Sequence, residues 1–190
     1  RSWADRVVTA ISSLAIAIPD FWLAMLLVIL IAIHAHLLPA IGYTPLGTSP
    51  ASWAQHLLLP WLALGIGGAA SVARQIRGTM IDTLDQDYIR TAVAKGLSPL
   101  RVIGKHALKN AVSPVVTIVG IQYAYLLGGT LIIEEIFSLP GIGAYLIVAI
   151  GDKDLPAVQG VALLTAVTFV VINLVVDVVY AYLNPKVRLG

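Results

Sequence analysis

The sequence predicts an all-α integral membrane protein with four membrane-spanning helices and one polar, cytoplasmic two-helix loop. Three observations support this fold class. Of the 190 residues, 58% are hydrophobic and 12% are charged, whereas soluble domains carry about 25% charged residues. The apolar residues form four long segments, each near the roughly 20 residues that a bilayer-crossing helix needs. Between the second and third segments lies a polar stretch, Asp82–Val112, which we call the polar loop.

The four apolar spans follow one another along the whole chain. The first runs from Val7 to Leu38 and is interrupted at Pro19-Asp20, which either kinks this span or splits off an interfacial helix. The others are Leu57–Val72, with Pro60 near its start, Val115–Ile133 and Val158–Leu183. Small residues in the second and third spans let helix backbones approach closely; these are Gly65, Gly68, Ala69, Gly120, Gly128 and Gly129.

The basic residues indicate which side of the membrane each loop faces. Of the twelve Lys and Arg residues, all but Lys153 lie near the two ends of the sequence or between the second and third spans. Loops rich in Lys and Arg remain on the cytoplasmic side. Both ends of the sequence, with Arg1, Arg6, Lys186 and Arg188, and the polar loop are therefore predicted to be cytoplasmic.

The polar loop is predicted to hold two short helices joined by a tight corner. The first helix ends at Gly96, because glycine adopts the left-handed conformation that ends helices without steric penalty. The second begins with Ser98 as N-cap and Pro99 at the first helical position. Two helices at a corner on the wet side of a membrane form a docking element.

The first of these helices, Tyr88–Lys95, is too short to be stable alone in water. Acidic residues near its start suit the positive end of a helix: Asp82, Asp85 and Asp87. An apolar patch on it is expected to enter a groove on a soluble partner; this patch consists of Tyr88, Ile89 and Ala92.

The second helix is predicted to carry a basic face and an apolar face. Basic residues recur every four positions, at Arg101, Lys105 and Lys109. The other face is formed by Leu100, Ile103, Ala107 and Asn110 or Ala111. This pattern fits a helix that lies on anionic lipid and equally a helix that binds a partner protein.

Two motifs lie in the polar loop and directly after it: DYIRTAVAKGLSP (Asp87–Pro99) and HALKNAVSPVVT (His106–Thr117). They resemble the permeases of binding-protein-dependent ABC importers, in the branch that carries dipeptides, oligopeptides and nickel. The general family pattern Glu-Ala-Ala, three residues, Gly, and later Ile-x-Leu-Pro is altered, because its Glu, Ile and Pro are absent here. The resemblance continues through IPDFWLAMLLVIL (Ile18–Leu30), LLPAIG (Leu37–Gly42), GTLIIEEIFSLPGIG (Gly129–Gly143), DLPAVQG (Asp154–Gly160) and NLVVDVVYAYLNPKVR (Asn173–Arg188).

This resemblance implies a single transmembrane domain (residues 1–190) that corresponds to the last four of six permease helices and lacks the N-terminal part. It implies a multi-pass protein of the bacterial or archaeal cytoplasmic membrane. Its polar loop would dock in a cleft of a cytoplasmic ATPase subunit through Asp87, Tyr88, Ile89, Thr91, Ala92, Ala94, Lys95, Gly96, Leu97 and Ser98.

The other implied partners are a second homologous permease subunit, an extracytoplasmic substrate-binding protein and membrane lipid, without nucleic acid. The chain itself would bind no cofactor, since ATP and magnesium belong to the partner ATPase. The sequence correspondingly has no phosphate-binding glycine loop with Lys-Ser/Thr. Residues expected at the binding-protein contact are Glu134, Glu135, Pro140 and Gly141. Capping of the following segment is an equal alternative for the two glutamates.

Polar residues within the spans are candidates for the solute path, because such side chains usually face the interior of a helix bundle or a wet cavity. They are Ser71, Gln75, Gln122, Tyr123 and Tyr125. Hydrogen bonding between helices is the alternative. Asn173, Asp177 and Tyr180 form a polar stripe in the last span, for which we expect a structural role, including pairing of Asp177 with Arg74 or Arg77.

The predicted function is ATP-driven alternating access for short peptides, with nickel chelates and glutathione as open alternatives. No covalent chemistry is expected, so the chain is not predicted to be an enzyme. A proton-coupled secondary transporter would use Asp177 and the histidines as a relay, yet almost no ionisable groups lie near the bilayer centre. An intramembrane aspartyl protease would need two facing aspartates at depth. The histidines lack the spacing of a metal cluster, so no metal site is expected.

Overall fold

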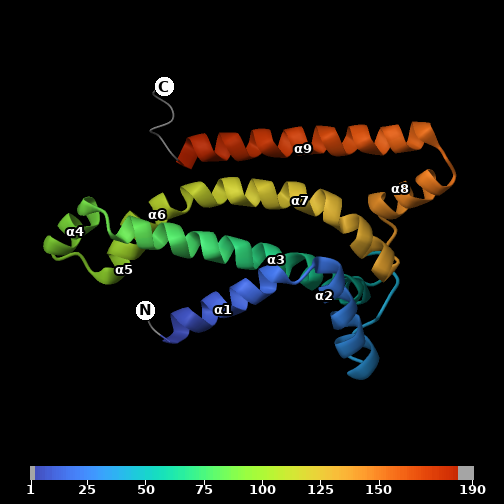
Figure 1. Cartoon of the computed structure of the whole chain (residues 1–190), viewed down its shortest axis with the longest axis horizontal. Coiled ribbons are helices and arrows are strands. Elements are labelled where there is room, and N and C mark those ends of the chain that lie inside the picture. Colours follow the sequence, from blue (N-terminus) through green and yellow to red (C-terminus); the bar gives the residue numbers. More distant parts are fainter. Residues whose placement is uncertain (1–2, 184–190) are drawn as a thin grey trace. The chain divides into compact units, whose positions relative to one another are not determined.

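The computed structural model describes residues 3–183, and the elements over this range are helices, as predicted (Figure 1). Arg1, Lys186 and Arg188 lie outside the described residues. In chain order the elements are α1 (Trp3–Ala17), α2 (Asp20–Leu27), the π-helix η1 (Val28–His34), α3 (Pro50–Leu84), α4 (Asp87–Ala94), α5 (Pro99–Arg101), the π-helix η2 (Val102–Ala107), α6 (Leu108–Ala111), α7 (Ser113–Phe137), α8 (Ile142–Gly151) and α9 (Leu155–Leu183).

Three of the described helices are long and apolar enough to cross a membrane: α3, α7 and α9. A fourth candidate span is broken, because α1 and the helix Asp20–His34 meet at an angle of 100°. The break falls at Pro19, whose extended ψ of 139° precedes the first turn of α2. The four predicted spans are therefore present when the bent pair is counted as one, and the interruption at Pro19-Asp20 is a sharp corner.

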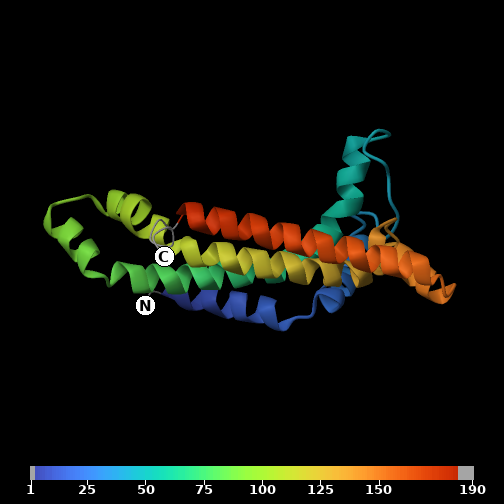
Figure 2. The same ribbon diagram turned by 90° about the horizontal axis from the view of Figure 1, so that it is seen from above.

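Helix α3 is longer than the predicted span Leu57–Val72, since it begins at Pro50 and ends at Leu84. It changes direction in its first half, as Figure 2 shows. Pro60 lies inside this part of the helix and is buried. A proline removes one backbone hydrogen bond and is a common cause of such a bend.

The chain divides into two compact units. The first, Arg1–Ala70 with Ala124–Thr168, has a core of small and large apolar side chains. These are Ala24, Ala32, Leu59, Ala63, Ile133 and Phe137, contributed by α2, η1, α3 and α7. The outer segment after η1 is held to this core by the Gly42 amide, which donates to the carbonyl of Phe137 at 2.9 Å.

The second unit, Ser71–Tyr123 with Phe169–Gly190, contains the end of α3, the polar loop, the start of α7 and the end of α9. Helices α7 and α9 pack closely at Gly120, where an added Cβ would lie 2.8 Å from Cγ2 of Val176. Glycine is therefore required there, and the expectation that Gly120 permits close helix approach is confirmed. No side chain in the most apolar part of α9 is buried, as suits a surface facing lipid or another helix.

Candidate coupling loop and solute path

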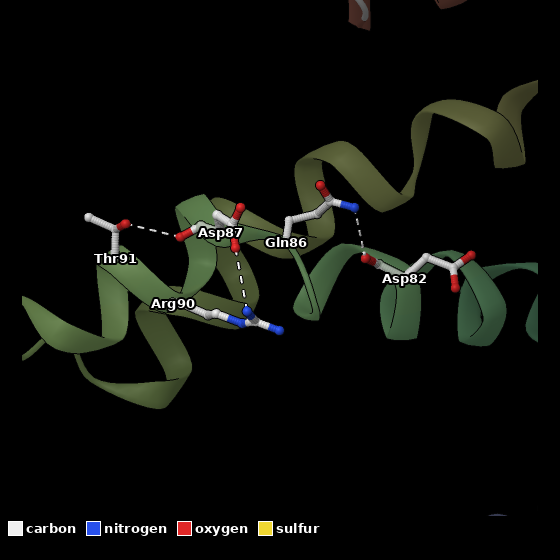
Figure 3. Close-up of polar contacts among 5 residues, drawn as sticks. All are labelled: Asp82, Gln86, Asp87, Arg90 and Thr91. Atoms are coloured by element: carbon white, nitrogen blue, oxygen red, sulfur yellow. Dashed lines mark hydrogen bonds and ion pairs between the residues drawn. The ribbon is translucent and has the colours of Figure 1, made fainter.

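The polar loop begins where α3 ends, and short polar contacts mark this junction (Figure 3). Asp82 lies in the last turn of α3, so it does not sit at the start of α4 as predicted. Its backbone carbonyl accepts a hydrogen bond from Gln86 Nε2 at 3.3 Å. Asp87 does occupy the first turn of α4. It lies 3.5 Å from Arg90, but both side chains are largely exposed, and such surface pairs contribute little to stability.

Helix α4 ends in a Schellman motif at Gly96. This residue has φ of +79°, and its amide donates to the carbonyl of Val93 at 2.9 Å. The amide of Leu97 donates to the carbonyl of Ala92 at 3.3 Å, which completes the paired hydrogen bonds of this motif. The predicted helix end at Gly96 is confirmed, and the left-handed conformation explains why glycine stands there.

After the corner, Ser98 has the extended backbone of an N-cap residue (ψ 147°), and Pro99 begins α5, as predicted. The Ser98 side chain makes no capping hydrogen bond, so its contribution is through the backbone. Its carbonyl accepts from the amides of Arg101 and Val102, both at 3.0 Å. The chain therefore turns back toward α4 within a few residues.

The two halves of the polar loop share a core of their own. Ile89 and Ala92 of α4 are 4% and 6% exposed, and they pack with Val102 and Ala107 of η2. The prediction that Ile89 and Ala92 form a patch for a partner is therefore wrong, and of that patch only Tyr88 is exposed. A short amphipathic helix needs an apolar surface, and α4 finds it within the same loop.

The second half of the polar loop differs from the predicted continuous α-helix. The π-helix η2 follows the single turn of α5, so a spacing of four residues does not align side chains as in an α-helix. Val102 is buried together with Ala107, whereas Leu100 is 86% and Ile103 44% exposed. The predicted apolar face is therefore divided, because Ala107 is buried within the loop whereas Leu100 and Ile103 are exposed.

The basic side chains in this half of the loop are predicted from the sequence to form one face of an α-helix. Arg101 and Lys105 are both exposed, while the side chain of Lys109 lies outside the described part. Arg101 and Lys105 therefore do not lie on one face of a continuous α-helix, because the backbone from Val102 to Ala107 is the π-helix η2.

Side-chain hydrogen bonds tie the polar loop to α3 and to itself. Asn110 Nδ2 donates to the hydroxyl of Tyr88 at 2.9 Å and to the carbonyl of His106 at 3.0 Å. Thr79 of α3 donates to the carbonyl of Ala111 at 2.9 Å. Both views place α6 beside the end of α3, in agreement with this bond (Figures 1 and 2). The loop is therefore a folded element rather than a flexible connection.

The predicted coupling residues divide by exposure. Ile89 and Ala92 are buried and Leu97 is half-buried. The exposed ones are Asp87, Tyr88, Thr91, Ala94, Lys95, Gly96 and Ser98. Sequence reasoning left Val93 out of this set, although it is 58% exposed. Helical spacing gives no signal for it, because Val93 stands four residues after the buried Ile89 and therefore lies near the same helix face.

The candidate path residues lie on α3 and α7. Ser71, Gln75 and Gln122 are half-buried, whereas Tyr123 is 49% and Tyr125 62% exposed. In α9, Asn173 donates to the carbonyl of Phe169 in its own helix at 2.9 Å. Asp177 is exposed and forms no ion pair within residues 3–183, so the predicted pairing with Arg74 or Arg77 is absent there.

At the C-terminal end of α7, Glu134 caps the helix α8. Its Oε2 accepts a hydrogen bond from the amide of Ala144 at 3.0 Å, in the first turn of α8. A Cβ on Gly143 would lie 2.6 Å from Cα of Leu131 and 2.9 Å from the same Oε2. Glu134 therefore has the capping role, while the neighbouring Glu135 is exposed. A carboxylate at a helix N-terminus is stabilising because it satisfies free amides.

Residues 1–189 match the family model described as the binding-protein-dependent transport system inner membrane component. The chain is 42% identical over 187 residues to a putative peptide transport system permease protein of Brucella abortus (strain 2308), covering 98% of this chain and 60% of the relative. It is 39% identical over 186 residues to a probable peptide ABC transporter permease protein of Sinorhizobium fredii, covering 98% and 59%. It is 42% identical over 186 residues to a glutathione transport system permease protein of Escherichia coli (strain K12), covering 98% and 58%.

The chain thus spans about 60% of the length of these relatives. The match extends over nearly all of its residues, through the apolar helices and the polar loop alike. The resemblance inferred from the separated sequence motifs is thereby confirmed. This chain belongs to the family of binding-protein-dependent transport system inner membrane components, the permeases of ABC importers.

Proposed function

We propose that this chain is the transmembrane domain of an ABC importer permease that moves short peptides across the bacterial or archaeal cytoplasmic membrane. The observation that carries the proposal is the polar loop. It is a folded helical element with its own core, it lies outside the apolar spans, and it presents exposed apolar side chains. The permeases of peptides and of glutathione among its relatives support the solute class.

The polar loop lies on the cytoplasmic side in this proposal. The Lys and Arg residues between α3 and α7 outnumber those of the outer segments, where Lys153 is the single one. A cytoplasmic loop is the part of the chain that a soluble ATPase can reach. Orientation and docking therefore depend on the same segment.

The docking surface is formed by the exposed apolar and polar side chains on the outside of the loop. Val93, Leu100 and Ile103 are 58%, 86% and 44% exposed, and Tyr88 is 43% exposed. Exposed apolar side chains that cluster on one folded element are typical of an interaction site. The buried Ile89 and Ala92 contribute indirectly, because they hold α4 against η2.

Motion of the docked ATPase reaches the membrane through the connections of the loop. Chain continuity joins the loop to α3 at one end and to α7 at the other. The bond from Thr79 to the carbonyl of Ala111 couples the end of the loop to α3, and the network of Tyr88 and Asn110 holds the two halves of the loop together. ATP-driven closure of the ATPases can then reorient α3 and α7 and alternate access to the path.

The remaining components follow from the same proposal. ATP and magnesium bind to the ATPase subunits, and this chain binds no cofactor. A second permease subunit covers apolar helix surface such as that of α9, and lipid covers the rest. The extracytoplasmic binding protein contacts the exposed Glu135 and Pro140 near α8. Glutathione, which is a small peptide, is the alternative solute. It is favoured by the similarity to the glutathione transport system permease protein of Escherichia coli.

The proposal is tested with the full-length permease and its ATPase subunits. Leu100→Asp places a charge at the most exposed apolar position of the polar loop. The variant is expected to reduce co-purification of the ATPase and solute-stimulated ATP hydrolysis at least about tenfold, corresponding to about 1.4 kcal/mol of binding free energy.

The matched control is Leu155→Asp, the same substitution at a 67% exposed leucine at the start of α9. This variant is expected to retain ATPase association, because its site lies outside the polar loop. Equal association for both variants and the wild type would show that the loop is not the docking element.

A further inference from the structure

Asp20 is an acidic side chain at the corner between α1 and α2, inside the first compact unit. It stands four residues before Ala24, which is 0% exposed in the core of that unit, so both lie on the same face of α2. The side chain is half-buried. It is directed toward protein and not toward the outside of the helix.

The carboxylate of Asp20 lies against two other helices at glycine positions. Its Oδ1 is 3.4 Å from the point that a Cβ on Gly67 of α3 would occupy. Its Oδ2 is 3.9 Å from the corresponding point on Gly129 of α7. Both neighbours lack a side chain, so the carboxylate has room beside the two helix backbones.

Within residues 3–183 this carboxylate takes part in no hydrogen bond or ion pair. A charged group surrounded by apolar helices is costly unless a partner of opposite charge compensates it. Gly67 lies within the apolar span Leu57–Val72, and Gly129 lies within the apolar span Val115–Ile133.

An aromatic ring lies near the same glycine. Cε1 of Tyr125 is 4.0 Å from the Cβ point on Gly129, and Oδ2 of Asp20 is 3.9 Å from it. Tyr125 is 62% exposed. A carboxylate and an aromatic ring that can reach one point form a suitable environment for an ammonium group, through charge and cation–π attraction.

We propose that Asp20 and Tyr125 form a binding site for the ammonium group of the solute on its way through the membrane. This inference rests on the proposed function and deepens it, since short peptides carry an N-terminal ammonium. Gly67 and Gly129 leave space beside the carboxylate, because a Cβ at these positions would be in van der Waals contact with it. The site favours solutes with a free amine over those in which the amine is acetylated.

The test uses the full-length permease assembled with its partner subunits in proteoliposomes. ATP-dependent uptake is compared for a dipeptide and for the same dipeptide with an acetylated N-terminus. Asp20→Asn is expected to lower uptake of the free-amine peptide about tenfold relative to that of the acetylated peptide. The binding protein is the same in all samples, so its own preference cancels when variants are compared.

Three further variants separate recognition from folding. Tyr125→Phe keeps the ring and is expected to behave like the wild type, whereas Tyr125→Leu is expected to reduce the preference for the free amine. Asp177→Asn removes an exposed acid of α9 and is expected to leave the preference unchanged. Basal ATP hydrolysis and subunit co-purification report whether each variant assembles.

A second readout is binding of both peptides to the nanodisc-embedded complex without the binding protein. It keeps the comparison measurable for a peptide that the binding protein does not deliver. If Asp20→Asn lowers binding and uptake of both peptides equally, or changes neither, the ammonium site is wrong while peptide transport stands. If the wild type transports neither peptide, the proposed function fails and this inference with it.

Discussion

Replacing Gly96 by alanine tests whether the left-handed corner holds the polar loop together. Gly96 has φ of +79°, and no atom lies within 4 Å of an added Cβ. The effect of Gly96→Ala is therefore a backbone cost alone. For a residue with a Cβ this cost is about 1–2 kcal/mol. The substitution should weaken the Schellman motif by this amount without any steric clash.

The assay is amide hydrogen exchange of the polar loop in the nanodisc-embedded permease. The amides of Gly96 and Leu97 donate the two hydrogen bonds of the motif. A loss of 1–2 kcal/mol corresponds to exchange about 5–30-fold faster through local opening. The matched control is Gly104→Ala, at a glycine of η2 that also has nothing within 4 Å of an added Cβ and lacks a positive φ.

Gly104→Ala is expected to leave exchange unchanged or slower, since alanine is up to about 1 kcal/mol better than glycine inside a helix. Equal exchange for Gly96→Ala and the wild type would refute the reasoning. It would mean that the corner is not constrained by its backbone conformation. Faster exchange for both variants would point to general loosening of the loop instead.

Two other substitutions test contacts of the apolar helices. Glu134→Gln removes the charged acceptor at the start of α8 and should destabilise that helix by about 1 kcal/mol, which is measured as faster hydrogen exchange of the Ala144 amide. The control Glu135→Gln should leave this exchange unchanged. Equal protection of the Ala144 amide in both variants would contradict the capping role. Gly120→Ala should lower the thermal stability of the permease by about 1–3 kcal/mol of overpacking against Val176, and Val176→Ala should restore it. Failure of this rescue would show that the two helices do not meet at Gly120.

Local chemistry explains which features of the polar loop could be predicted. Gly96 and Pro99 act through their own backbone restrictions, so a single sequence is enough to place the corner and the next helix start. Pro19 similarly marks the break in the first span, although its 100° angle depends on the packing of α2.

Features that depend on long-range contact could not be predicted in the same way. Ile89 and Ala92 are buried because Val102 and Ala107 return against them, and the periodicity of α4 does not reveal which surface covers its apolar face. The π-helix η2 changes the alignment of side chains after Arg101, so a spacing of four residues does not reveal which of them are exposed.

The same holds for the acidic residues of the spans. Glu134 and Glu135 are neighbours of the same type, and only the return of α8 makes Glu134 a cap. Asp20 is an acid after a proline in an apolar stretch, which is a visible signal in the sequence. Its proximity to Gly67 and Gly129, from two distant helices, requires the fold.

The most direct test of the central claim is the accessibility of a cysteine at position 100. The 190-residue sequence contains no cysteine, so Leu100→Cys introduces a single thiol into this part of the protein. We predict that a membrane-impermeant maleimide labels it in inside-out vesicles, that it fails to do so in right-side-out vesicles, and that bound ATPase subunits protect it. Labelling from the outside, or labelling that the ATPase subunits do not change, would contradict a cytoplasmic loop that docks on a motor protein.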